Sequence, residues 1–166
     1  MRLPFLRRDY ALLELQSEDS DAIAGLHEED FRRPWSSNEF DALLEQDTVF
    51  GFGLRQVGYP KSRLVGFVLA RLAAGEGEIL TISVARSYRR YGLGRSLIDA
   101  VLRRLWAERA EELFLEVDET NLPAIGLYRR LGFFEVGRRP GYYEHEGQNR
   151  SDAIVMRREV WRTPES

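Results

Sequence analysis

The chain of 166 residues contains no cysteine, one lysine (Lys61) and two histidines, His27 and His145. The absence of cysteine excludes a disulfide, a zinc–thiolate site and a cysteine nucleophile. The histidines are far apart in the sequence and Glu144-His145-Glu146 is not a zinc motif, so no metal site is expected.

Long apolar runs are missing as well. No stretch approaches the roughly 20 apolar residues of a membrane span. Residues 1–8 carry arginines but no apolar segment long enough for a secretory signal peptide. The sequence therefore predicts a cytoplasmic protein with no membrane partner.

The composition is that of a globular protein, with 43% hydrophobic and 31% charged residues. This length fits one domain, which we expect to span residues 1–166. The chain is long enough to bury a sizeable core.

Charge is unevenly distributed, although the net charge is only −3. Residues 11–47 hold eleven acidic residues and two arginines, a net charge of −9, whereas residues 86–104 hold six arginines and one aspartate, a net charge of +5. The chain lacks the basic excess of a general nucleic-acid-binding protein. The basic block suits a polyanionic ligand and the acidic block a basic one, unless both are simply solvated surface.

The hydrophobic pattern predicts both strands and helices. Strands are expected at residues 10–15, 48–55, 63–71, 78–84, 113–117, 133–138 and 152–157. Helices are expected at residues 20–31, 36–45 and 121–131, and a long one with a wide apolar stripe at residues 93–106. This order predicts an α/β (α+β) fold with a single mixed central β-sheet of about six to seven strands flanked by about four helices.

Capping and turn residues set the expected boundaries. Ser20 is an N-cap candidate for the first helix, and Ser36 or Ser37 for the second. Asn121 can cap the last helix, which Gly132 would stop. A turn is expected at residues 58–60, and a long polar loop with two tyrosines at residues 140–150.

The clearest candidate for a binding site is the segment from Arg89 to Ser96, between a predicted strand and the start of the long helix. Free backbone N–H groups and the helix dipole make an anion site there. Gly92 and Gly94 let a phosphate approach the main chain, and the arginines add positive charge. The segment is interpreted as a pyrophosphate cradle, the alternative being a turn with surface arginines.

Two other phosphate motifs are excluded. A Walker P-loop needs a lysine after its second glycine, but Lys61 follows Pro60. The dinucleotide fingerprint G-x-G-x-x-G fails because Leu97 stands in place of its third glycine.

The arrangement resembles the GNAT superfamily of N-acetyltransferases, whose acetyl-CoA signature Q/R-x-x-G-x-G/A corresponds to Arg89-x-x-Gly92-x-Gly94. Ile82-Ser83-Val84 resembles the splayed strand of that family, and residues 121–133 resemble the second half of its cofactor site. Within the superfamily the chain is most similar to the RimI type, which acetylates the N-terminal alanine of a ribosomal protein. The resemblance covers residues 31–156.

The resemblance implies acetyl-CoA as cosubstrate and direct acetyl transfer, with no metal. The implied cofactor-binding residues are Ile82, Ser83, Val84, Arg89, Arg90, Tyr91, Gly92, Leu93, Gly94, Arg95, Ser96, Asn121 and Tyr128. The backbone N–H near Ser83 and Val84 would stabilise the oxyanion.

Two residues are implied as catalytic. Glu116 would be the general base, acting through water, and strand alternation puts it on the opposite face from Leu115 and Val117. Tyr128 would be the acid that protonates the thiolate of coenzyme A. From the residues alone, an ordinary surface glutamate and a half-buried packing tyrosine remain alternatives.

The implied acceptor is a protein N-terminus, gripped by Phe31 and Trp35 in one loop and by Tyr142 and Tyr143 in another. An α-amine, with a pKa of about 7.7–8.0, is far more often neutral near pH 7.5 than a lysine amine with a pKa near 10.4, so one carboxylate acting through water suits it better. A small-molecule amine, a lysine side chain and a non-catalytic acyl-CoA sensor remain alternatives. We expect no nucleic-acid partner, and either a monomer or a homodimer.

Overall fold

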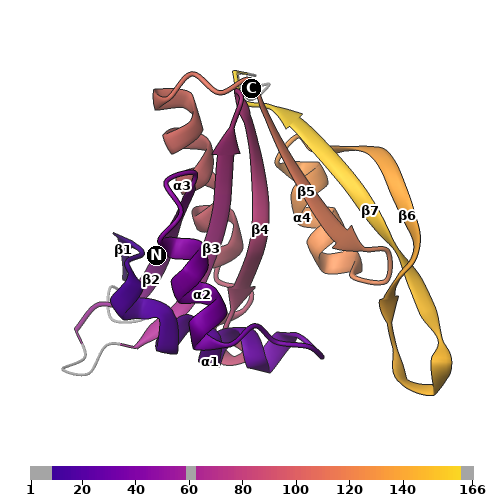
Figure 1. The fold of residues 1–166 in the computed structure, drawn as a ribbon, viewed down its shortest axis with the longest axis horizontal. Helices are drawn as coiled ribbons and strands as arrows, with labels where there is room; N and C mark the ends of the chain where they lie inside the picture. Colours follow the sequence, from indigo (N-terminus) through magenta and orange to yellow (C-terminus); the bar gives the residue numbers. More distant parts are fainter. Residues whose placement is uncertain (1–8, 59–62, 162–166) are drawn as a thin grey trace, which may run out of the picture. The chain divides into compact units, whose positions relative to one another are not determined.

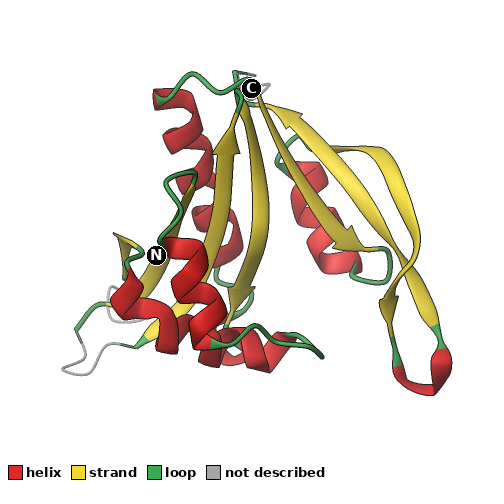
Figure 2. Ribbon diagram, in the orientation of Figure 1, coloured by secondary structure: helices red, strands yellow, loops and turns green. Residues whose placement is uncertain are grey.

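The computed structural model describes residues 9–58 and 63–161 of the chain. In that part, seven β-strands form one sheet and four α-helices accompany it (Figures 1 and 2). The strands are β1 (Tyr10–Glu14), β2 (Val49–Gln56), β3 (Leu64–Ala73), β4 (Glu76–Val84), β5 (Glu112–Asp118), β6 (Phe134–Glu144) and β7 (Arg150–Glu159). The α-helices are α1 (Ser20–Asp30), α2 (Ser37–Leu44), α3 (Leu93–Ala107) and α4 (Leu122–Arg130), and the 3-10 turns are η2 (Ser17–Asp19), η3 (Arg86–Tyr88) and η4 (Glu146–Gln148).

The sheet is mixed, with the strand order β1-β2-β3-β4-β5-β7-β6. Strands β4 and β5 run parallel, whereas β1–β2, β2–β3, β5–β7 and β6–β7 pair antiparallel. The predicted fold class, a single mixed sheet with about four helices, is confirmed. The turn expected at residues 58–60 lies mostly outside the described residues.

The chain divides into two compact units. Unit 1 comprises Met1–Arg71 and Leu80–Val101, and unit 2 comprises Leu72–Ile79 and Leu102–Ser166. Strands β3 and β4 and helix α3 therefore contribute residues to both units. That these units form one domain stays a prediction.

In unit 1, helices cover both faces of the strands (Figure 1). Leu26 of α1 and Phe40 of α2 belong to one buried cluster with Phe67 of β3. Gly66, the neighbour of Phe67, points to the opposite face, where a Cβ atom on it would lie 3.5 Å from Leu97 of α3. Alternation along β3 thus sends successive residues to opposite helical layers.

The starts of the first two helices differ in how they are capped. Ser36 caps α2 as predicted: its Oγ accepts the Glu39 N–H at 3.2 Å, and the Glu39 carboxylate accepts the Ser36 N–H at 2.8 Å. The expectation that Ser20 caps α1 was wrong. The turn η2 precedes α1 directly, so Asp19 is the N-cap and Ser20 is already helical.

The α3 stripe is buried along most of its length, from Leu93 to Leu105. Its last member differs, because Trp106 remains 49% exposed. Its ring lies 4.1 Å from that of Trp161, which is itself exposed. Helix α3 ends one residue later, at Ala107, so Trp106 lies at the end of the helix, where the apolar stripe is no longer buried.

In unit 2, β5 alternates as predicted: Leu115 and Val117 are buried and Glu116 is half-buried. Asn121 caps α4, its Oδ1 accepting the Ala124 N–H at 3.3 Å. Gly132 follows α4 with a φ of 92°, a left-handed conformation that suits glycine.

The prediction of a long polar loop at residues 140–150 was wrong. Strand β6 continues to Glu144, and only the short η4 turn separates it from β7 (Figure 2). A register shift between Arg139 and Tyr143 accommodates Pro140, and Gly141 there has a φ of 61° and donates its N–H to Asp152 Oδ1 at 3.0 Å. Because β6 is the last strand in the sheet order, a proline and an irregularity are tolerated in it. Tyr142 and Tyr143 are therefore strand residues.

Candidate active site

The strand–helix junction of unit 1 has an open backbone. Arg90 and Gly92 both have a positive φ, of 69° and 76°. Apart from Gly92 and its two chain neighbours, no atom of the described residues lies within 4 Å of where a Cβ on Gly92 would stand. The first backbone hydrogen bond of α3 runs from the Ser96 N–H to the Gly92 carbonyl at 3.1 Å, so the preceding N–H groups have no helical partner. This geometry fits a pyrophosphate, as the sequence predicts.

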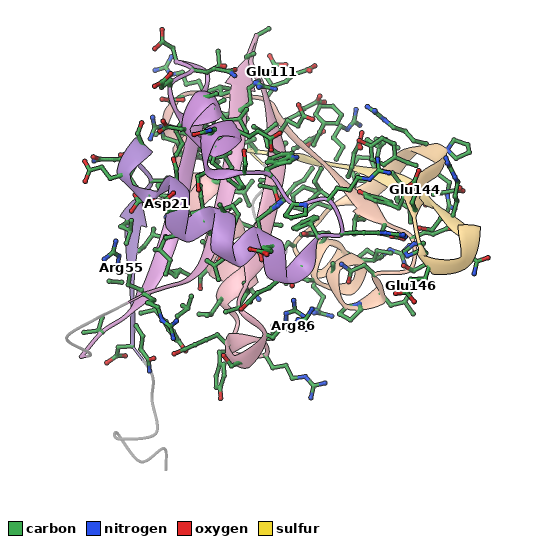
Figure 3. All side chains as sticks on the ribbon, turned by 60° about the horizontal axis from the view of Figure 1, so that its bottom comes forward. Asp21, Arg55, Arg86, Glu111, Glu144 and Glu146 are labelled. Carbon is green, nitrogen blue, oxygen red and sulfur yellow. The ribbon has the colours of Figure 1, made fainter. Side chains whose placement is uncertain are left out.

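The arginines around this junction are not equivalent. Arg89 Nη2 forms an ion pair with Asp30 Oδ1, at the end of α1. Arg86, which is labelled in Figure 3, donates to the Glu29 carbonyl at 2.7 Å. Arg95 is 66% exposed and only 3.9 Å from Asp99. Arg95 is therefore the better placed to meet an anion, while Arg89 is engaged with α1.

The end of β4 contributes mainly through its backbone. Ser83 is buried, and its hydroxyl donates to Asp30 Oδ2 and, at 3.4 Å, to the Leu26 carbonyl. Its side chain is thus committed to α1 and not available to a ligand. Ile82 and Val84 are half-buried. At the start of α3, Leu93 is buried core and Tyr91 is 53% exposed, so of these two only Tyr91 presents a side chain to solvent.

The loop between α1 and α2 carries Phe31 and Trp35. Phe31 is 38% exposed and Trp35 is half-buried. Both rings stack on His27, with centroids 4.0 Å and 5.1 Å from the imidazole. The four-residue spacing of His27 and Phe31, at the end of the helix predicted over residues 20–31, is the signal for this stack in the sequence. The sequence interpretation considers His27 only as a metal ligand and therefore misses the stack.

In unit 2, Glu116 has a partner that sequence reasoning missed. Its Oε1 lies 2.9 Å from Arg139 Nε, on β6, and its side chain is 24% exposed. The same guanidinium lies 5.7 Å from the ring centroid of Tyr142. Arg139 therefore contacts both Glu116, the implied general base, and Tyr142, one of the two tyrosines implied to bind the acceptor.

Tyr128 is buried on α4, with its ring edge-on to Phe133 at 5.9 Å. Burial raises the pKa of Tyr128 to about 12, because the phenolate would lose its solvation. The phenol therefore keeps its proton throughout the neutral range.

Tyr143 lies within electrostatic reach of both implied catalytic groups. Burial first, and then the charges of Glu116, Tyr142, Asp118 and Tyr128, raise its pKa to about 12. The rings of Tyr142 and Tyr143 meet edge to face, with centroids 5.1 Å apart. Unit 2 thus brings Glu116, Tyr128, Tyr142 and Tyr143 into one neighbourhood.

A polar cluster at the end of β5 was also missed. Asp118 accepts hydrogen bonds from Ser151 Oγ at 2.7 Å and the Thr120 N–H at 3.0 Å, and its Oδ2 lies 3.1 Å from His145 Nε2. Burial alone would raise the pKa of Asp118, but the hydrogen bonds from Ser151 and Thr120 outweigh it and hold that pKa below its usual value. The cluster ties β5 to the β6–β7 hairpin that carries the tyrosines.

Two further findings concern the described residues only. No helix in residues 9–58 and 63–161 combines the length and apolar character needed to cross a membrane. In the same part of the chain, no group of three or more His, Asp or Glu side chains could hold a metal ion.

Similarity to known proteins identifies the class of protein to which this chain belongs. The sequence profile of the acetyltransferase (GNAT) family matches residues 20–133. The [ribosomal protein bS18]-alanine N-acetyltransferase of Escherichia coli (strain K12) is 32% identical over 142 residues, which are 86% of this chain and 92% of that protein. The N-alpha-acetyltransferase of Saccharolobus solfataricus is 28% identical over 164 residues, 91% of this chain and 93% of that protein.

A solved structure agrees with these matches. The crystal structure of the Escherichia coli ribosomal-protein-S18-alanine N-acetyltransferase superimposes with a TM-score of 0.84 at 28% identity, covering 95% of this chain and 98% of that one. The chain therefore belongs to the acetyltransferase (GNAT) family. It is an N-acetyltransferase that uses acetyl-CoA as its acetyl donor.

Proposed function

We propose that this enzyme acetylates the N-terminal α-amine of a protein, and that a ribosomal protein is its natural acceptor. The similarity to the ribosomal-protein acetyltransferase of Escherichia coli supports this acceptor. The observation that carries the chemistry is the series of contacts in unit 2 from Glu116 to Arg139, from Arg139 to Tyr142 and from Tyr142 to Tyr143. We place the enzyme in the cytoplasm, as a monomer or homodimer.

In the proposed reaction each residue handles one proton or charge. Glu116 takes the proton of the attacking amine, directly or through water, while Arg139 holds its carboxylate. Tyr128 gives a proton to the leaving thiolate, for which its buried, protonated phenol is suited. Backbone N–H groups near Ser83 and Val84 stabilise the developing oxyanion. Acetyl-CoA supplies the acetyl group.

Binding of the two substrates is assigned to different segments. The residues proposed to hold acetyl-CoA are the β4 end and the junction, namely Ile82, Ser83, Val84, Arg89, Arg90, Tyr91, Gly92, Leu93, Gly94, Arg95 and Ser96, together with Asn121 and Tyr128. Of these residues, Ser83 and Leu93 bind acetyl-CoA through their backbone groups, because their side chains are buried. Phe31, Trp35, Tyr142 and Tyr143 are proposed to bind the acceptor peptide.

The acceptor is identified by acetyl-CoA turnover with a panel of amines. The panel contains peptides beginning Ala-Arg and Ser-Arg, an N-terminally blocked peptide with a free lysine, a polyamine and free amino acids, and mass spectrometry locates the acetyl group. We expect acetylation of the α-amine of the unblocked peptides. Turnover on lysine or small amines alone would refute the protein N-terminus as acceptor. Binding of acetyl-CoA without any turnover would instead favour a sensor.

The acidic segment predicts a dependence on salt for a basic acceptor. Glu28 and Glu29 lie exposed in the last turn of α1, beside the loop of Phe31 and Trp35. Carboxylates at a helix C-terminus oppose the helix dipole, so they do not stabilise α1. We expect kcat/KM for a basic peptide to fall by about tenfold or more between about 0.1 M and 1 M salt, as the Debye length shrinks from about 10 Å to 3 Å.

Steady-state kinetics across a salt series measure this effect, with a peptide of neutral sequence as the control. Combined Glu28→Gln and Glu29→Gln substitutions should flatten the salt dependence. The hypothesis fails if the basic and neutral peptides respond alike.

A further inference from the structure

The strongest feature that the proposed reaction leaves unexplained is His27, in the last turn of α1. It is a polar residue with only 2% of its surface exposed. The Phe31 ring lies 11° from the imidazole plane and the Trp35 ring 22° from it. Phe40 meets the imidazole edge-on, with centroids 5.3 Å apart. His27 is thus the centre of an aromatic cluster that reaches from the core to the loop.

His27 holds both ends of the loop from Phe31 to Trp35. At the start, its backbone carbonyl accepts the Phe31 N–H at 3.1 Å. At the end, its ring Nδ1 accepts the Trp35 N–H at 3.0 Å. Residues 32–34 between these bonds are exposed and belong to no helix or strand. The His27 side chain therefore fixes the position of Trp35, at the end of this irregular segment, relative to helix α1.

The imidazole must be neutral at Nδ1 to accept this bond. Burial lowers the pKa of His27 to about 4, although the nearby Asp30 and Glu39 carboxylates raise it. An acceptor at Nδ1 also assigns the remaining proton to Nε2. Throughout the neutral range His27 is therefore a fixed acceptor.

We propose that His27 is a positioning residue for the acceptor substrate, setting how Phe31 and Trp35 are presented by the loop they bound. The proposal rests on the proposed function in one respect, that this loop contacts the acceptor. It goes beyond that function by assigning acceptor affinity to a buried residue that touches neither substrate.

Three substitutions separate the two contributions of His27. His27→Asn places an amide oxygen near the position of Nδ1, and His27→Gln, equally polar, places it near Nε2 instead. His27→Phe keeps a ring for stacking but has no acceptor. The exchange rate of the Trp35 amide, measured by NMR, reports the hydrogen bond, and KM for an Ala-Arg peptide reports its consequence.

We expect His27→Gln and His27→Phe to speed exchange of the Trp35 amide and to raise the peptide KM by about tenfold, the effect of losing one buried hydrogen bond. KM for acetyl-CoA should stay unchanged and kcat should change little. His27→Asn should retain the slow exchange and most of the peptide affinity. Because the Asn and Gln variants are matched in polarity and both lack the ring, general destabilisation would affect both.

Faster Trp35 exchange with an unchanged peptide KM would overturn the proposal, as would equal KM values for the Asn and Gln variants. Both results presuppose that the wild type acetylates peptides. A wild type with no peptide activity would instead refute the proposed function, and with it the acceptor role of this loop.

Discussion

Replacing Glu116 with glutamine is expected to lower kcat/KM for a peptide by about 10²–10⁴-fold at neutral pH, the usual contribution of a general base. Glutamine matches glutamate in shape but cannot take a proton. The loss should shrink above about pH 9, where an α-amine with a pKa of about 7.7–8.0 is already deprotonated. Kinetics across a pH series with the Glu116→Gln variant measure both effects.

Strand β5 offers a matched control for this substitution. Glu112 lies on the same face, four residues earlier, and pairs with Arg157 at 3.5 Å as Glu116 pairs with Arg139. Both glutamates are partly exposed, so either ion pair contributes little to stability. Glu112→Gln should leave kcat/KM unchanged. A similar loss in the two variants would contradict a catalytic role for Glu116.

Replacing Tyr128 with phenylalanine is expected to reduce kcat by about 10²–10⁴-fold, because the leaving thiolate loses its proton donor. The substitution removes only a hydroxyl and keeps the buried ring that packs edge-on against Phe133. The free energy of unfolding should therefore change little, because most of the buried apolar surface of the side chain is retained. Single-turnover rates and denaturant unfolding test the two statements together.

The pKa of Tyr128 also sets an expected pH dependence. Burial disfavours the phenolate and raises this pKa from 10 to about 12, so the proton donor is present at every pH below that range. The wild-type rate should accordingly show no loss from Tyr128 ionisation up to about pH 11.

Tyr10 in β1 is the control for this substitution, because Tyr10→Phe also removes only a hydroxyl, one that is buried and without a hydrogen-bond partner among the described residues. Tyr10→Phe should not change kcat. If Tyr128→Phe turned over acetyl-CoA as fast as Tyr10→Phe, another group would have to protonate the thiolate.

Much of the fold follows from local pattern. The alternation of Leu113, Leu115 and Val117 fixes one buried face of β5, and the stripe that begins at Leu93 fixes the buried face of α3. Ser36, Asn121 and Gly132 mark helix ends through bonds or backbone conformations that involve only near neighbours in sequence. Such signals are readable because they act over a few residues.

The hairpin of β6 and β7 shows where local pattern was not enough. Pro140, Gly141 and Gly147 are typical of a loop, yet β6 continues to Glu144 by pairing with β7 across a register shift. The strand pairing and the Asp152 side chain stabilise this conformation, and both lie outside the local sequence. Propensity was overridden by tertiary hydrogen bonds.

The candidate site divides in the same way. By its sequence alone the chain determined its family resemblance, the open junction at Gly92 and the placement of Glu116 and Tyr128 on elements of known type. Only the tertiary structure decided which residues of the site contact one another. Asp30 contacts Ser83 and Arg89, Arg139 contacts Glu116, and His27 contacts Trp35. These partners are 8 to 59 residues apart in the chain, and no periodicity or motif spans such distances. Folding alone brings them together, because burying the apolar faces sets where the polar groups between them must find partners.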